Sequence, residues 1–251
     1  MRKPLIAGNW KMNNNVSDSL KFAATLSVEL KAAGQIDVVM APPFTALYSM
    51  GVALSDTEFK LAGQNLFWED SGAFTGEVSG EFLAEIGCTY VIVGHSERRQ
   101  YFGETNETVN KRLMAAIRHG LIPIMCVGEN LAQRENGDTW QIIEEQLTDG
   151  LRGIDLRTVA HFVIAYEPVW AIGTGKTASP DEASGVHDSI RNYLKERYGD
   201  ETAGKIRLIY GGSVTPANSR ELITRENIDG ALVGGASLDP KKFADIVRSA
   251  H

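Results

Sequence analysis

The sequence contains few cysteines and no long apolar run. Its two cysteines, Cys88 and Cys126, lie beside strand-like segments of a 251-residue chain, and we expect both to be buried, reduced thiols. No apolar stretch approaches the roughly 18 residues of a membrane span. The basic start of the chain is not followed by an apolar segment with a cleavage site. We therefore expect a cytoplasmic protein that does not bind membranes.

Basic residues are also scarce relative to acidic ones. The chain has 25 Lys and Arg against 32 Asp and Glu, a net charge of −7. Nucleic acid backbones are bound by basic faces, and no cluster of Lys and Arg here is long enough to form one. The negative net charge does not exclude a small anionic substrate. Salt screens charges more than about 8 Å away, so the groups next to the binding site determine whether an anion binds.

Glycine, by contrast, is abundant, with 25 residues, and many of these glycines end short β-branched runs. Eight such runs recur about 32 residues apart, the length of one strand-plus-helix unit. They span residues 4–10, 36–41, 59–63, 89–93, 121–126, 160–166, 205–210 and 228–233. Most are apolar without alternation, which is typical of parallel strands buried on both faces. We predict an α/β fold in one domain, 1–251: a closed (β/α)8 barrel of eight parallel strands with outer helices.

An open, doubly wound sheet is the alternative, but the Gly-x-Gly-x-x-Gly pattern that usually follows its first strand is missing. Helices are indicated between the runs. Ser17 is the expected N-cap of the first helix, and Ser179 and Asp239 each precede a proline at a helix start. Asn136-Gly137 is expected to divide the helical segment 129–151.

Polar residues follow several of the predicted strands, where a barrel carries its active site. These strand-end residues are Asn9, Lys11, Gln64, Asn65, His95, Glu167, Gly211-Gly212-Ser213 and Gly234-Gly235. Glu167 precedes an apolar segment, 168–172, and the glycines Gly173 and Gly175. Either it is a turn-capping acid, or it is a base under a loop that closes over a ligand. The segment 173–177 also resembles a phosphate loop, but Trp170 stands where that motif requires glycine.

His95 and Lys11 each have an ordinary interpretation, a structural histidine and a solvated lysine. At the start of a helix, however, the helix dipole should lower the pKa of His95 and keep its ring neutral. A neutral imidazole can donate a hydrogen bond to a substrate oxygen. Lys11 offers a positive charge to an anionic substrate. Gly211-Gly212-Ser213 and Gly234-Gly235 offer backbone N–H groups after strands seven and eight, where barrels often bind phosphate.

Taken together, six segments in the same order resemble the triosephosphate isomerase family along essentially the whole chain. They are Gly8–Asn13, Gly72–Glu77, Gly94–Arg99, Ala165–Gly175, Tyr210–Val214 and Leu232–Leu238. The resemblance implies an isomerase that interconverts dihydroxyacetone phosphate and D-glyceraldehyde 3-phosphate through an enediolate, without cofactor or metal.

The resemblance also implies residue roles. Glu167 is similar to the family's base, His95 to its electrophile, and Lys11 and Asn9 to its polar substrate contacts. Glu97 and Ser96 resemble supporting residues, and Gly173, Ser213, Gly234 and Gly235 resemble the phosphate-binding backbone. A homodimer is implied, with the long connection 64–78 docked on the partner and Thr75 near the partner's Lys11. A Schiff-base aldolase and a barrel that only binds sugar phosphates are the competing functions.

Overall fold

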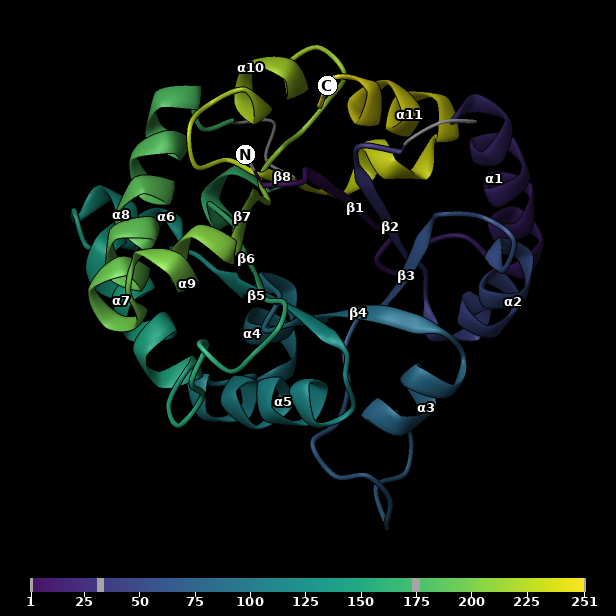
Figure 1. Cartoon of the computed structure of the whole chain (residues 1–251), viewed down its shortest axis with the longest axis horizontal. Coiled ribbons are helices and arrows are strands. Elements are labelled where there is room, and N and C mark those ends of the chain that lie inside the picture. The colour runs from purple at the N-terminus through teal and green to yellow at the C-terminus, as the bar shows by residue number, and fades with distance from the viewer. Residues whose placement is uncertain (1, 31–33, 173–176, 251) are drawn as a thin grey trace.

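The chain forms a closed ring of eight parallel strands surrounded by helices, which confirms the predicted barrel (Figure 1). The computed structural model describes residues 2–30, 34–172 and 177–250. The strands follow one another around the ring in sequence order. They are β1 (Leu5–Asn9), β2 (Asp37–Ala41), β3 (Lys60–Gly63), β4 (Cys88–Val93), β5 (Ile122–Val127), β6 (Val163–Tyr166), β7 (Arg207–Tyr210) and β8 (Gly230–Val233).

The helices lie outside this ring. They are α1 (Val16–Glu29), α2 (Phe44–Leu54), α3 (Gly80–Glu85), α4 (Ser96–Phe102), α5 (Asn106–Arg118), α6 (Leu131–Glu135), α7 (Thr139–Gly150), α8 (Pro180–Tyr198), α9 (Asp200–Lys205), α10 (Ser219–Ile223) and α11 (Pro240–Arg248). Short 3-10 turns, η1 (Val169–Ala171) and η2 (Gly235–Leu238), follow β6 and β8.

Alternate residues of each strand face two separate cores. In β1, Leu5 and Ala7 point into the barrel, where they join a core of inward-facing strand residues that includes Cys126. Ile6 lies between them in sequence and packs outward, against the apolar faces of the helices. Because both sides of each strand are buried, the strands are apolar without alternation. Cys88 and Cys126 are both buried and free of disulfides, as predicted.

Most predicted helix boundaries are confirmed. Ser179 caps α8 through a capping box with Glu182, and Asp239 caps α11. The chain between α6 and α7 breaks at Asn136-Gly137. The prediction of Ser17 as the first N-cap was wrong, because the helix begins earlier: Val16 is already helical, and the Asn15 side chain accepts a hydrogen bond from the Asp18 amide at 3.0 Å.

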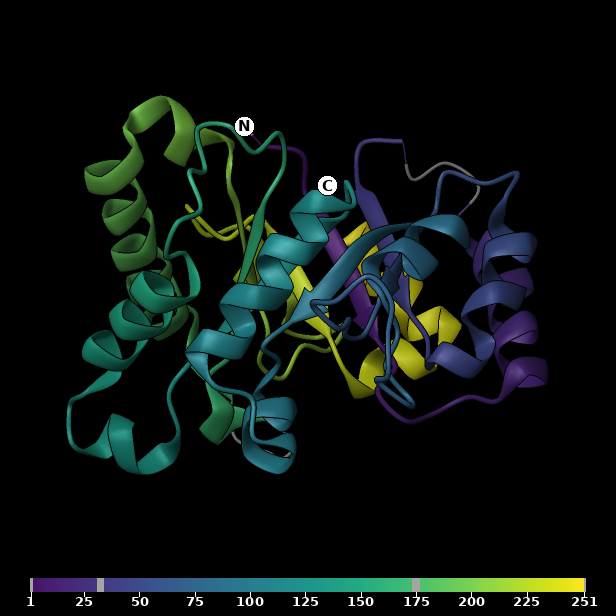
Figure 2. The same ribbon diagram turned by 90° about the horizontal axis from the view of Figure 1, so that it is seen from below.

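The barrel closes where β1 pairs with β8, with Leu5 opposite Gly230. Gly230 has a φ of 144°, and a Cβ atom built on it would lie 1.9 Å from the Leu5 carbonyl oxygen. Only glycine allows the two strands to approach this closely. Figure 2 shows both ends of the chain on the same side of the barrel.

His187, on α8, is fully buried and sits beside the ring of Tyr166. Its Nδ1 lies 2.9 Å from the Asn227 carbonyl oxygen, which can only accept, so the ring proton is on Nδ1. Burial lowers the pKa of His187 to about 4. The folded state therefore takes up the second ring proton only at a lower pH than the unfolded state does.

This difference predicts acid destabilisation. The contribution of His187 is fully present above its unfolded pKa of about 6.5 and is lost as the pH falls to about 4, which amounts to about 3 kcal/mol. We expect His187→Asn, which keeps a side-chain N–H but does not titrate, to lose less stability than the native protein between pH 7 and pH 4.5. Urea unfolding at the two pH values measures this, with the exposed His161→Asn as control. Equal losses of unfolding free energy in His187→Asn and in the native protein would show that His187 is not the source of the acid destabilisation.

The connection 64–78 has no helix or strand, only an isolated bridge between Phe67 and Ser79. It projects beyond the ring of helices next to α3 (Figure 1). Its aromatic side chains stack on one another, with the Phe67 ring centroid 4.1 Å from that of Trp68 and 4.6 Å from that of Phe74. This internal packing gives the projecting segment a defined shape without regular hydrogen bonding.

Candidate active site

A pocket of about 270 Å³ opens at the carboxyl ends of the strands. Nine of the predicted strand-end residues line it together: Asn9, Lys11, His95, Glu167, Gly211, Gly212, Ser213, Gly234 and Gly235. They follow β1, β4, β6, β7 and β8. Barrel closure therefore brings together residues as distant in sequence as Asn9 and Gly235, which are 226 positions apart. Gly173 lies outside the described residues.

Glu167 is held at the end of β6 and is almost fully buried, with 2% of the residue exposed. One carboxylate oxygen lies 2.9 Å from His95 Nε2, and the other accepts a hydrogen bond from the Ser96 amide at 3.0 Å. Burial raises the pKa of Glu167, but His95 and the Ser96 amide lower it by more, so its pKa lies below the ordinary value. In this arrangement the carboxylate is ionised and stabilised by two donors.

Two glycines make room for Glu167. A Cβ atom on Gly128, directly after β5, would lie 1.8 Å from the Glu167 carbonyl oxygen, and one on Gly211 would lie 2.8 Å from its Cγ. The main chain of Glu167 is fixed at the same place, since its amide donates to the Val127 carbonyl at 2.8 Å. The strands on both sides therefore determine where the carboxylate stands.

His95 is the N-cap of α4, and its Nδ1 accepts a hydrogen bond from the Glu97 amide at 3.2 Å. An accepting Nδ1 carries no proton, so the ring is neutral and its proton is on Nε2, facing Glu167. The expected lowering of the pKa was wrong for this arrangement. Burial does lower the pKa of His95, but the carboxylates of Glu167 and Glu97 raise it by more. The ring stays neutral in this arrangement because Nδ1 accepts the Glu97 amide.

Lys11 reaches the same pocket from a strained backbone, with a φ of 53°. Its amide donates to Asn9 Oδ1 at 3.1 Å, and its carbonyl accepts from Gln64 Nε2 at 2.9 Å. The Lys11 ammonium lies 2.6 Å from Glu97 Oε1, and its side chain passes beside Gly234. Asn9 and Gln64 thus hold the backbone that directs Lys11 into the pocket, and Glu97 orients its charge.

Backbone groups line the other side of the pocket. Ser213 and its two preceding glycines follow β7, and η2 begins directly after Gly234. The Ser237 hydroxyl and amide both donate to the Gly234 carbonyl, at 2.7 and 2.8 Å. These bonds fix the turn whose first residues, Gly234 and Gly235, line the pocket.

The apolar segment after Glu167 forms η1, and Trp170 within it is anchored outside the pocket. Its indole Nε1 donates to Glu129 Oε1 at 2.9 Å, and the Arg134 guanidinium lies 4.6 Å from the centre of its ring. Glu129 is fully buried and also accepts from the Tyr166 hydroxyl at 3.1 Å. Glu129 was not predicted from the sequence, although it lies just after β5, at a strand end like the other site residues.

The remaining predicted residues lie outside the pocket lining. Ser96 and Glu97 stand behind it and contact Glu167, His95 and Lys11. Thr75 is exposed, in the projecting connection 64–78. In the described part of the chain, no three His, Cys, Asp or Glu side chains are grouped to hold a metal ion. No helix of the described residues is long and apolar enough to cross a membrane.

Comparison with known proteins covers nearly the whole chain. The family model for triosephosphate isomerase matches residues 4–250. The chain belongs to the triosephosphate isomerase family. It is 54% identical over 247 residues to a triosephosphate isomerase of Moorella thermoacetica, which covers 98% of both chains. It is 50% identical to one of Endomicrobium trichonymphae over 99% of both chains, and 49% identical to one of Dictyoglomus turgidum over 99% of this chain and 100% of that one.

Triosephosphate isomerase is thus the family that the six segments predicted, and the predicted isomerase activity on triose phosphates is confirmed at this level of identity. The family match begins at Pro4 and ends at Ala250, so it includes every strand of the barrel.

Proposed function

We propose that Glu167 and His95 carry the interconversion of dihydroxyacetone phosphate and D-glyceraldehyde 3-phosphate in this pocket. Glu167 takes a proton from one carbon, and the C–H electron pair forms the double bond of an enediolate. His95 gives its Nε2 proton to the oxygen that becomes negative and takes a proton from the hydroxyl on the neighbouring carbon, so the ring ends neutral. Glu167 then delivers its proton to the adjacent carbon, so no atom is gained or lost.

The contact between Glu167 and His95 Nε2, 2.9 Å long, carries this proposal. It supports a base and an acid that act on neighbouring atoms of one small substrate. The carboxylate is a weak base while the Ser96 amide and His95 hold it, because these donors stabilise its ionised form. In the proposed mechanism, Glu167 exchanges these contacts for the substrate carbon, and exclusion of water strengthens it as a base.

The phosphate and the developing oxyanion need separate partners. Lys11 and Asn9 are proposed to contact the substrate oxygens, with Glu97 and Ser96 as supporting residues. Ser213, Gly234 and Gly235 are proposed to bind the phosphate through their N–H groups, together with Gly173. A coupled assay of the purified protein with D-glyceraldehyde 3-phosphate tests the proposal. Turnover without any added metal or cofactor is expected, and its absence would contradict the assignment.

The Schiff-base aldolase is the weaker candidate. It requires a lysine in the barrel interior, and the end of β6 carries Glu167 instead. Lys11 is the one lysine among the described residues that line the pocket, and its ammonium is paired with Glu97 at 2.6 Å. We expect borohydride to trap no substrate on the protein.

We also propose that the chain forms a homodimer through the connection 64–78. Large apolar side chains are exposed on the loop after β1 and on α2, α3 and α4, all within the first four strand–helix units. They are Met12, Tyr48, Phe82, Tyr101 and Phe102, each at least 53% exposed. Such a gathering of exposed apolar groups is typical of an interaction surface. Docking of the connection on a partner would bring Thr75 towards that partner's Lys11.

The cytoplasmic location stays a prediction.

Sedimentation measures this association. We expect a dimer at micromolar concentration, and we expect Phe82→Glu to shift it towards monomer because a charge would be buried in the interface. Val28→Glu, on α1, is the matched control, since Val28 is 65% exposed and lies far along the sequence from the connection. A native protein that sediments only as monomer would overturn the dimer.

A further inference from the structure

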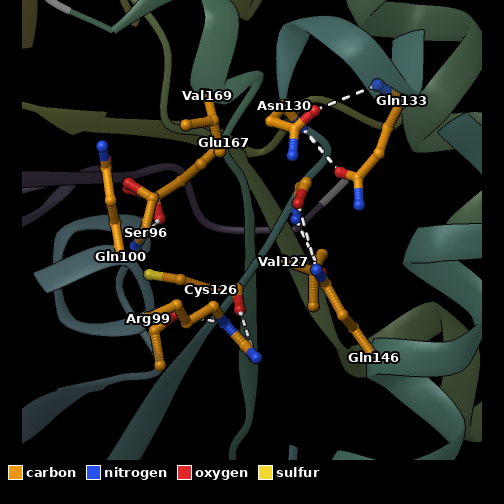
Figure 3. A pocket seen from close by; sticks show the side chains of 12 residues that line it. Ser96, Arg99, Gln100, Cys126, Val127, Asn130, Gln133, Gln146, Glu167 and Val169 are labelled. Carbon is orange, nitrogen blue, oxygen red and sulfur yellow. Dashed lines mark hydrogen bonds between the residues drawn. The ribbon is translucent and has the colours of Figure 1, made fainter. Parts of the chain in front are cut away.

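A second cavity of about 390 Å³ lies next to Glu167 (Figure 3). It is lined by α4, the end of β5, the segment that follows β5, α6, α7 and the start of η1. Glu167 is the one residue that lines both spaces. Figure 3 shows the amide side chains of Asn130, Gln133 and Gln146 on one side and Glu167, Ser96 and Gln100 on the other. The proposed isomerase chemistry leaves this cavity unused.

Arg99 supplies the positive charge of this cavity. Among the described residues its guanidinium donates only to neutral acceptors: the Gly94 carbonyl at 2.9 Å, Asn106 Oδ1 at 2.7 Å and the Cys126 carbonyl at 3.4 Å. Every other described arginine that is not exposed has a carboxylate partner. Arg99 is half-buried without one, and burial lowers its pKa. A partly desolvated charge of this kind is usually compensated by an anion.

Groups near Arg99 do not supply that anion. Glu167 lines the cavity, but its carboxylate is already engaged by His95 and the Ser96 amide. Burial keeps the Cys126 thiol neutral by raising its pKa. Glu104 acts on Arg99 from a distance and is paired with Arg98.

Side-chain amides provide further donors around the cavity. The Asn130 and Gln133 side chains use their oxygens to cap α6, and their NH₂ groups have no hydrogen-bond acceptor among the described residues. Gln146 donates one side-chain N–H to the Gly128 carbonyl at 3.1 Å, and its second N–H is available to a ligand. Gln100 is exposed on α4. The lining therefore presents one uncompensated cation and several free donors.

We propose that this cavity is a binding site for a small organic oxyanion, a carboxylate or a phosphate ester. The Arg99 guanidinium pairs with the charged group, and the amides of Asn130, Gln133 and Gln146 donate to its oxygens. The cavity is larger than the 270 Å³ pocket assigned to a triose phosphate, so an anion of three or four carbons fits. The site depends on the fold and on Arg99, and it would exist whatever the roles of the residues in the substrate pocket.

Calorimetric titration tests the site with two probes, malonate for carboxylates and inorganic phosphate for phosphates. All proteins in this test carry Gly235→Glu, whose added carboxylate repels anions from the substrate pocket and whose Cβ atom meets nothing within 4 Å. Four are compared: this parent protein, and the parent with Gln133→Glu, Gln100→Glu or Gln100→Lys. Gln133→Glu preserves the cap of α6, because glutamate at this position also accepts from the Asn130 amide. We expect one equivalent of probe to bind the parent protein, and the probe with the higher affinity identifies the class.

The charge changes give the discriminating result. We expect each glutamate variant to weaken binding roughly three- to tenfold and Gln100→Lys to strengthen it about threefold. Arg99→Met should abolish binding, with its folding checked by circular dichroism since three hydrogen bonds are lost. Equal affinities in all four proteins, or no binding of either probe at millimolar concentration, would overturn the proposal. In the absence of the probes, substitutions at Gln100 and Gln133 alone are expected to leave the isomerase rate unchanged. A failure to bind anions in this cavity is therefore distinguishable from a failure of the proposed catalytic function.

Discussion

Glu167→Gln is expected to lower kcat by about 10²- to 10⁴-fold, the usual loss when one positioned acid–base group is removed. The substitution keeps the size of the side chain but removes the charge that accepts the substrate proton. Phosphate ligands should bind nearly as well as before, because Lys11 and the backbone after β7 and β8 are untouched. Steady-state kinetics and direct titration with glycerol 3-phosphate measure the two effects separately.

The same variant gives a second, independent result. The carboxylate of Glu167 raises the pKa of His95, so its removal should lower the His95 pKa and leave the ring neutral over a wider range. NMR titration of the His95 ring follows this directly. Glu167→Asp refines the test, since it keeps the charge and withdraws it by one methylene. Turnover at the native rate by Glu167→Gln would show that another group is the base.

Gly128→Ala is expected to lower kcat about 100-fold without touching any catalytic side chain. Its new Cβ atom would meet the Glu167 carbonyl oxygen at 1.8 Å, so the main chain of Glu167 must move. A displacement of about 1 Å at a reacting group can cost two orders of magnitude in rate. Overpacking should also destabilise the fold by about 1–3 kcal/mol. Kinetics and thermal unfolding of the same preparation measure both losses.

Gly185→Ala is the matched control for this substitution. Gly185 lies within α8, and a Cβ atom there meets nothing within 4 Å. Alanine in a helix interior is favoured over glycine by about 0.5–1 kcal/mol, so this variant should be more stable and fully active. Gly211→Ala should lie between the two, because its Cβ atom meets the flexible Glu167 side chain at 2.8 Å rather than backbone. A fully active Gly128→Ala would mean that the position of Glu167 is less constrained than the strands indicate.

The order of strands and the positions of the reactive residues could be predicted from the sequence, because both depend on a simple rule. Apolar runs are strands, and a parallel barrel gathers the residues after its strands at one end. Lys11, His95 and Glu167 are therefore brought together by topology alone. The same rule applied to β5 points to Glu129, whose buried bonds to Tyr166 and Trp170 were not anticipated.

Effects that depend on contacts between distant segments could not be predicted from the sequence. The pKa of His95 was predicted from its own helix, whereas the opposing influence comes from Glu167, 72 positions away. Ser17 was expected to cap the first helix, whereas Asn15 caps it, because the helix begins two residues earlier than expected. The unpaired state of Arg99 is likewise visible only once every carboxylate has been placed.

The seam between β1 and β8 has a consequence for how the protein is made. The first strand to leave the ribosome is hydrogen-bonded in the finished barrel to the last one, with Leu5 opposite Gly230. Until β8 is synthesised, β1 has an unpaired edge, and such edges can pair with other chains. Closure of a loop this long costs entropy before the contacts compensate for it. The barrel must therefore complete its fold after nearly the entire chain has emerged, and chaperones that shield the β1 edge should increase the yield of active protein.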